Sequence, residues 1–441
     1  MPKAEKTIFF TIFATVLPII IIGSRYDSEG DLFMPLNTLI LLYSSYRIFF
    51  TSDKESLNCN VITYLFTYLF LGIAPRVQFV AKSNIWGGRP LTEIDYVMTS
   101  LLIIFSLISY DIFYARFLKI NYKYKEIDTT INIRIWLPTL FSIVSVAITL
   151  YVYSKQPILL IYREFSDLLV DEELLIKNSS ISLIYSKFVR PIPVLVLIYY
   201  NLLANKHNNI LRWFFILLIL ISNFPLSLGR NYVAALYIPL LISFFPNILH
   251  HYWIKVGAIL GVLIIFPFLN QGREMNSFSE MTIGVNTHMF LEGHFDNFSN
   301  LARLVRAGTI TYGQQLLGVL LFFVPRSIYP DKPIATGGYI ADLYNLDFDH
   351  ISMNFWGEGY INFGIIGVIL FSALLAYINA FFDRPHKHNL RISSILQCNY
   401  TIYLGLLFFI LRGDLMSGFA YTVGILLSSH LIHRSFAAGI N

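Results

Sequence analysis

Residues 96–118 read YVMTSLLIIFSLISYDIFYARFL, and Asp111 and Arg116 are the only charged side chains among them. A helix of about 20 mostly apolar residues is long enough to cross the hydrocarbon core of a bilayer. Similar stretches recur along the chain, so we expect transmembrane helices over residues 7–23, 32–50, 61–80, 96–118, 133–153, 183–204, 211–228, 232–249, 253–270, 361–382, 394–411 and 415–433. The pattern predicts an all-α polytopic membrane protein with about 12 transmembrane helices.

The composition of the 441 residues agrees with this class of protein. Hydrophobic residues make up 56% of the chain and charged residues only 13%, and the mean hydropathy is +0.61, which excludes an average soluble domain. Lys3 and Lys6 precede the first apolar stretch and no small-residue cleavage site follows it, so we expect a retained helix rather than a signal peptide. Cys59 falls in a predicted loop and Cys398 in a predicted span, which leaves no disulfide framework.

Lys and Arg are concentrated in the short loops that would share a side with both termini, whereas most Asp and Glu fall on the other side. The positive-inside rule therefore predicts cytoplasmic termini and an outward-facing long loop. The net charge of +5 reports this topology, since no compact basic stripe indicates a nucleic-acid partner. We expect three regions, namely transmembrane helices 1–9 over residues 1–269, a large external loop over 270–360 and transmembrane helices 10–12 over 361–441.

The large loop contains an apolar run that ends at a group of prolines and cations. Residues 316–324 read LLGVLLFFV, which is too short to span a bilayer, so we expect an interfacial or re-entrant segment there. Residues 325–333, PRSIYPDKP, would then hold Arg326 and Lys332 at the depth of lipid headgroups on a backbone stiffened by proline. The alternative is a loop anchor whose cations reach toward water.

A second candidate lies at residues 294–307, where apolar side chains follow the spacing of one helix face. These are Phe295, Phe298, Leu301, Ala302, Leu304 and Val305. Arg303 and Arg306 are three residues apart and hence neighbours on the helix surface. Paired guanidinium groups suit phosphate oxygens, because each can donate two parallel hydrogen bonds. The alternative is an ordinary surface helix that carries two arginines.

Four further arginines fall within or at the outer ends of predicted spans: Arg190, Arg230, Arg273 and Arg412. Charges at the membrane cost several kcal/mol and usually persist because they face a polar cavity or a partner. A single residue of this kind is more often structural, and Asp414 could pair with Arg412. Four on one side, together with the basic loop cluster, indicate an anion-binding site.

Residues Asp347-Phe348-Asp349 have the spacing with which nucleotide-sugar glycosyltransferases hold a divalent metal. The segment is predicted to lie outside, where nucleotide sugars are not expected. His288, His294 and His350 lack a ligand-like spacing with Cys or carboxylates. We therefore predict no metal site and no cofactor, and the absence of a Walker-type phosphate loop argues against ATP hydrolysis.

Three sequence elements resemble one known family. Residues 324–333, VPRSIYPDKP, followed by Thr336-Gly337-Gly338, are similar to the outer-loop signature of bacterial O-antigen polymerases, the Wzy or oligosaccharide repeat-unit polymerase family. Residues 356–367, WGEGYINFGIIG, and residues 412–415, RGDL, are similar to two other elements of that family. The resemblance is concentrated in residues 310–415, and the first half of the chain matches in hydropathy alone.

This resemblance implies a multi-pass enzyme of the bacterial inner membrane, with a GT-C-like helical architecture and an active site that faces the periplasm. Such enzymes transfer a growing glycan from undecaprenyl pyrophosphate to a new lipid-linked repeat unit, without nucleotide sugar or ATP. Their partners are the lipid-linked oligosaccharide, membrane lipids and, for chain-length control, a co-polymerase.

The resemblance also implies roles for individual residues. Fixed cations are expected to neutralise the leaving pyrophosphate, and the candidates are Arg326, Lys332, Arg230, Arg273, Arg412 and Arg303. Glu358 or His350 is expected to act as the base for the acceptor hydroxyl. Trp356 and Tyr360 are expected to stack on sugar rings.

Two other functions share parts of this pattern. An O-antigen ligase has a similar architecture, transfers glycan to lipid A-core and is expected to carry a catalytic His in its large loop, for which His288, His294 and His350 are candidates. A lipid-linked oligosaccharide flippase or other transporter would show cations deep in many spans and repeat-like halves. Apart from Arg190 and Asp111, the charged residues of the predicted spans lie within five residues of a span end.

Overall fold

The computed structural model describes residues 3–22, 32–50, 56–120, 122, 135–162, 179–204, 208–265, 287–388, 390 and 393–437, and every regular element in these ranges is a helix. The helices before the large loop are α1 (Lys3–Thr11), η1 (Ile12–Val16), α2 (Leu17–Ile22), α3 (Phe33–Phe50), α4 (Cys59–Phe66), η2 (Thr67–Ile73), α5 (Ala74–Val80), α6 (Glu93–Leu118), α7 (Trp136–Val152), η3 (Pro157–Leu160), α8 (Ser179–Ile184), η6 (Tyr185–Val189), α9 (Ile192–Leu203), α10 (Asn209–Ser222), η7 (Pro225–Ser227), α11 (Arg230–Phe244), η8 (Pro246–His250), α12 (Trp253–Leu260) and η9 (Gly261–Ile265). Those of the loop and beyond are η11 (Thr287–Leu291), η12 (Gly293–Phe295), α14 (Asn297–Ala307), α15 (Gln314–Leu320), α16 (Thr336–Tyr344), α17 (Phe355–His388), α18 (Ser394–Arg412) and α19 (Leu415–Ala437).

Seven helical stretches of the described chain are long and apolar enough to cross a membrane. They are Cys59–Val80, Glu93–Leu118, Ile181–Leu203, Asn209–Ser227, Phe355–His388, Ser394–Arg412 and Leu415–Phe436. Three apolar helices, Trp136–Val152, Arg230–Phe244 and Trp253–Ile264, are shorter. The all-helical fold with several membrane-length helices agrees with a polytopic membrane protein, whereas the predicted count of 12 is not confirmed.

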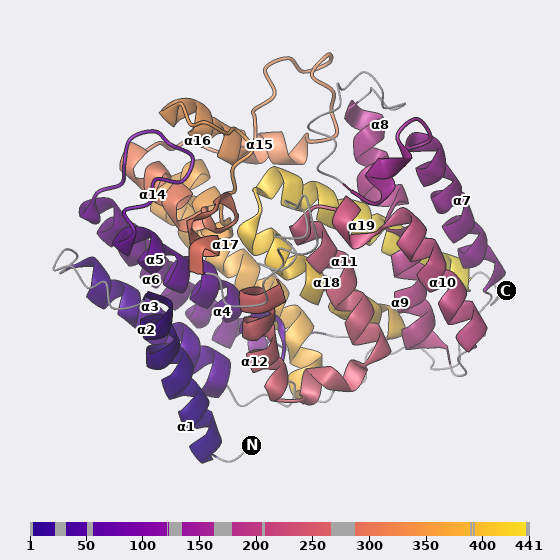
Figure 1. The fold of residues 1–441 in the computed structure, drawn as a ribbon, viewed down its shortest axis with the longest axis horizontal. Coiled ribbons are helices and arrows are strands. Elements are labelled where there is room, and N and C mark those ends of the chain that lie inside the picture. The colour runs from indigo at the N-terminus through magenta and orange to yellow at the C-terminus, as the bar shows by residue number, and fades with distance from the viewer. Residues whose placement is uncertain are drawn as a thin grey trace, which may run out of the picture.

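The bundle has two apolar cores, and α18 contributes to both. The N-terminal helices and α17 form one core with one face of α18, which includes Tyr403 and Leu407. Helices α7, α9, α10, α11 and α19 form the other core with a second face of α18, which includes Ile402 and Leu406. Figure 1 shows α18 and α19 between the indigo-to-purple helices and the magenta group α7–α10. The last residue of α18, Arg412, therefore lies where the two halves of the bundle meet.

Helix α17 is interrupted near its start. Phe363 and Gly364 have non-helical backbone angles, and φ +60° with ψ −143° at Gly364 is a conformation that favours glycine. A Cβ built on Gly367 would lie 1.8 Å from the carbonyl oxygen of Gly359, so the two segments touch backbone to backbone. The break separates a short piece that carries Glu358 from the membrane-length remainder. It falls at the start of the predicted span 361–382.

The described part of the large loop forms η11, η12, α14, α15 and α16, and Figure 1 shows α15 and α16 at the top of the view and α14 at its upper left. The amphipathic helix predicted at 294–307 is confirmed as α14, with Phe298, Leu301 and Leu304 fully buried. Within the apolar run 316–324, the helix α15 ends at Leu320, and turns continue to Pro325. Gly318 of α15 packs against Met416 of α19.

Two charged residues in the predicted spans have partners inside the protein. Asp111 accepts hydrogen bonds from Arg47 of α3, at 2.8 Å, and from the hydroxyl of Tyr43. Arg190 is 6% exposed and donates to the carbonyl of Ser222 and the hydroxyl of Ser227. Both residues therefore hold helices together.

Candidate functional site

A cavity of about 1210 Å³ opens at the end of the bundle that the loop covers. Its walls come from the α5–α6 loop, α8, the start of α11, the segments around η12, α15 and α16, and the α18–α19 junction. The polar residues of the lining are Trp86, Arg230, Asn231, Tyr232, His294, Asp296, Arg326, Lys332, Asp342, Asp349, His350, Ser352, Arg412, Asp414, Ser417 and Tyr421. Apolar lining includes Leu183, Ile184, Phe322, Phe323, Phe409 and Met416.

The structure brings four of the predicted cations to this cavity: Arg230, Arg326, Lys332 and Arg412. Arg230 is the first residue of α11, Arg412 is the last residue of α18, and the other two follow α15. We call these four residues the cationic wall. Arg273 lies outside the described residues.

Arg326 presents an exposed guanidinium at the cationic wall. Its side chain is exposed, and its hydrogen bond within the described chain is a long one, 3.3 Å, from Nη1 to the carbonyl of Pro330. No ion pair to Arg326 occurs among the described residues. Lys332, in contrast, closes its own loop by donating to the carbonyls of Val324 at 2.8 Å and Phe322 at 3.2 Å. Burial and the nearby Arg326 lower the pKa of Lys332.

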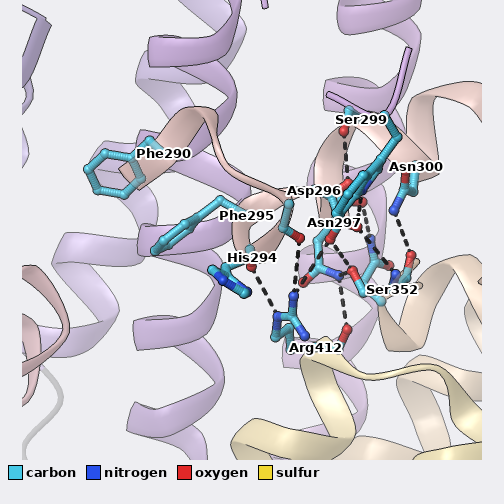
Figure 2. Close-up of polar contacts among 12 residues, drawn as sticks. Phe290, His294, Phe295, Asp296, Asn297, Ser299, Asn300, Ser352 and Arg412 are labelled. Carbon is cyan, nitrogen blue, oxygen red and sulfur yellow. Dashed lines mark hydrogen bonds and ion pairs between the residues drawn. The ribbon is translucent and has the colours of Figure 1, made fainter. Parts of the chain in front are cut away.

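Arg412 faces the start of the loop rather than Asp414, contrary to the pairing considered from sequence. Its Nε donates to the carbonyl of His294 at 3.0 Å, and its Nη2 lies 3.8 Å from Oδ1 of Asp296 (Figure 2). Asp296 is 1% exposed and also accepts from Trp86 Nε1 at 2.8 Å and from the hydroxyl of Ser352. Arg412 is therefore a cavity residue held in place by a buried carboxylate.

Two carboxyl groups lie side by side at the floor of the cavity. Asp414 lines it and accepts from the backbone N–H groups of Ser417 at 3.1 Å and Gly337 at 3.4 Å. Glu358 lies beneath the lining, 1% exposed, and accepts from Thr336 Oγ1 at 2.7 Å and Leu415 N at 2.9 Å. The predicted base Glu358 is thus absent from the cavity lining, whereas Asp414, at 7% exposure, is part of it.

Burial raises the pKa of the Asp414 carboxyl above its ordinary value, although hydrogen bonds from backbone N–H groups oppose the shift. A carboxyl that is protonated more readily than usual is better suited to exchange a proton near neutral pH.

His350, the other predicted base, also lines the cavity. Its side chain is 87% exposed, and its Nδ1 lies 3.8 Å from Oδ1 of Asp349.

Arg303, which was predicted to bind substrate, is not part of the cavity lining. Its side chain is fully buried and donates to the carbonyls of Ile85 at 2.6 Å and Gly87 at 3.2 Å, and to Asn300 at 3.0 Å. Its neighbour Arg306 forms an ion pair with Asp95. The two Nη atoms of Arg303 and the guanidinium of Arg306 donate to groups of the protein, and neither side chain lines the cavity.

Replacing Arg303 should therefore reduce stability. Arg303→Met would leave buried carbonyl groups without donors, and each hydrogen bond to a charged group is worth about 1.5–3 kcal/mol. We expect a loss of about 3 kcal/mol, measured as a lower midpoint of thermal unfolding of the purified protein in detergent. Arg89→Ala, at an exposed arginine of the α5–α6 loop that also contains Ile85 and Gly87, is the control. Equal midpoints for the two variants would contradict the structural role of Arg303.

Trp356 and Tyr360, which were predicted to stack on sugar rings, are also not part of the cavity lining. Trp356 is fully buried in the first core, and Tyr360 is packed against that core. The tryptophan that does line the cavity is Trp86, from the loop between α5 and α6. Sequence reasoning missed Trp86, and also Asp296. The Trp86-Gly87-Gly88 turn was a signal for an unusual backbone, but not for its partners.

No family model matches the chain, and no curated protein or solved structure matches it either.

Proposed function

We propose that the protein is a membrane glycosyltransferase that polymerises undecaprenyl-pyrophosphate-linked oligosaccharide repeat units into O-antigen or a related surface polysaccharide. The observation that carries this proposal is the cationic wall. Four cations from three separate parts of the chain line one cavity at one end of a bundle of membrane-length helices. Such a bundle can anchor a lipid, and fixed cations stabilise a pyrophosphate as it leaves.

In the proposed reaction, the bond between the anomeric carbon of the growing glycan and the pyrophosphate oxygen breaks, and a bond to a hydroxyl oxygen of the incoming repeat forms. Arg326 holds the leaving pyrophosphate, because its planar fork can make two parallel hydrogen bonds to phosphate oxygens. Arg230, Lys332 and Arg412 add positive charge around it. Asp414 takes the proton of the acceptor hydroxyl. The lipid pyrophosphate leaves with the bonding electron pair.

The apolar part of the lining supports a lipid-linked substrate. Leu183, Ile184, Phe322 and Phe323 lie in the same cavity as the cationic wall. A polyprenyl pyrophosphate carries an apolar tail directly on its charged group, so a site for it needs both kinds of surface within a short distance. The cationic wall provides the charged surface, and these four apolar residues provide the surface for the tail.

An O-antigen ligase is the second candidate, because His294 and His350 line the cavity. A histidine could then serve as the base that Asp414 supplies in the first proposal. A flippase is less well supported, since the charged pair Asp111 and Arg47 is satisfied within the protein rather than turned to a channel.

A lipopolysaccharide gel of a strain that lacks this chain distinguishes the candidates. Loss of a polymerase leaves a single repeat unit on the core. A missing ligase leaves no O-antigen on the core, and a missing flippase causes lipid-linked repeats to accumulate facing inward. We expect the first result, restored to a ladder by the wild-type chain, and either of the others would contradict the proposal.

A further inference from the structure

One part of the cavity lining is aromatic and acidic rather than cationic. It is formed by Trp86 from the α5–α6 loop and by Asp342, Phe348 and Asp349 from α16 and the segment after it. We call these four residues the aromatic wall. The rings of Trp86 and Phe348 are stacked, with centroids 4.7 Å apart and an angle of 23° between their planes. Phe348 remains 41% exposed, so the stack presents a ring to the cavity.

Contacts with other segments of the chain hold Trp86 in this stack. Trp86 has φ +66°, a left-handed conformation that is uncommon for a bulky residue and persists only where the surroundings enforce it. Its carbonyl accepts from Asp347 N at 3.1 Å, and its ring N–H donates to the buried Asp296. The ring lies directly on Gly293, where an added Cβ would come within 1.8 Å of it. The loop backbone on either side of Trp86 is bonded to the buried Arg303.

The carboxylates of the aromatic wall are not used to support the fold. Asp342 makes no side-chain hydrogen bond or ion pair with the described residues, and Asp349 has only the distant contact with His350, at 3.8 Å. Carboxylates repel a phosphate but accept hydrogen bonds from hydroxyl groups. The apolar C–H face of a sugar ring packs well on an exposed aromatic ring. The aromatic wall therefore suits sugar hydroxyls and not pyrophosphate.

We propose that the aromatic wall is a glycan subsite, in which Phe348 stacks on a sugar ring and Asp342 and Asp349 accept hydrogen bonds from its hydroxyl or amino groups. This inference rests on the proposed function, since the cationic wall would hold the pyrophosphate of the same substrate. It also defines the class of sugar. The carboxylates favour a neutral or amino sugar at this position and disfavour a uronic or sialic acid, whose charge they would repel.

Calorimetric titration of the purified full chain with a free oligosaccharide tests the subsite separately from catalysis. The probe is the repeat unit released by mild acid from the lipid-linked repeats of the cells that make this protein, so that it carries no pyrophosphate. We expect saturable binding by the wild type and by Arg326→Ala, and about tenfold weaker binding by Phe348→Ala, which is the loss of about one ring contact, or about 1.4 kcal/mol. Phe348→Tyr, which keeps the ring, should bind like the wild type.

Three outcomes would overturn the subsite: no binding by the wild type, equal binding by Phe348→Ala and the wild type, or tighter binding by Asp342→Asn/Asp349→Asn than by the wild type. The last of these would show that the carboxylates oppose the sugar. Failure of the proposed function looks different, because oligosaccharide binding would then persist in a protein that makes no polymer. Thermal unfolding of each variant confirms that it is folded.

Discussion

Arg326→Ala is expected to reduce the rate of polymerisation about 10²–10³-fold, the usual cost of one preorganised contact to developing negative charge. Arg326 has an exposed side chain, its hydrogen bond to the carbonyl of Pro330 is long, and it has no carboxylate partner in the described chain. Arg326→Lys should rescue little, because a point charge on a flexible stem does not reproduce the planar fork. The measurement is the initial rate of glycan growth by purified variants supplied with lipid-linked repeats.

Arg89→Ala is the matched control for this experiment. Arg89 is also an exposed arginine, but it is not part of the cavity lining. Its replacement should leave the rate within about twofold of the wild type, since exposed surface changes are small in effect. A normal ladder of long chains from Arg326→Ala, or an equal loss from both variants, would show that the cationic wall does not hold the leaving group.

Asp414→Asn should lower the rate about 10²–10⁴-fold, which is the range for loss of a general base. Burial raises the pKa of Asp414, so its basic form is lost as the pH falls through that raised pKa. The wild-type rate should accordingly decline on the acid side at a higher pH than an ordinary aspartate would give. The Asn variant should lack this decline, because no proton is gained at that position.

The pH profile of the Asn variant distinguishes the loss of a base from a distortion of the site. Asp414 accepts hydrogen bonds from Ser417 and Gly337, so the Asn variant could lose rate through a distorted floor. A distorted floor would lower the rate by the same factor at every pH and keep the acid decline. If Asp414→Asn retained that decline, the base would be another group, and His350→Ala and His294→Ala would be the next variants to assay.

Helices were predictable from sequence wherever the pattern was local. The apolar stretch 96–118 lies within one helix, α6, and the spacing of Phe298, Leu301 and Leu304 gave α14, because both patterns depend on residues close together in the chain. The break in α17 was not predicted. It depends on the positive φ of Gly364 and on the contact between Gly359 and Gly367, neither of which an apolar run reveals.

The candidate site was predictable in its charges and not in their contacts. Arg326 was singled out because it follows an apolar run too short to span a bilayer, and Arg412 because charges at the ends of spans are costly, and both line the cavity. Arg303 donates to carbonyl groups more than 200 positions away in the chain, which its sequence neighbours do not indicate. The carboxylate next to Arg412 is likewise Asp296, and not the nearby Asp414. Trp356 is buried in a core and Trp86 lines the cavity, and only tertiary packing decides between these two environments.

The central claim is that this chain itself links lipid-borne repeats, using arginines rather than a metal ion to hold the pyrophosphate. The direct measurement is made with purified protein in liposomes, given lipid-linked repeat units and excess EDTA. We predict a ladder of longer lipid-linked glycans, together with release of undecaprenyl pyrophosphate in proportion to the bonds formed. Failure to elongate, or elongation that stops in EDTA and returns with Mg²⁺ or Mn²⁺, would contradict the account, and the second result would make Asp347 and Asp349 the candidate metal ligands.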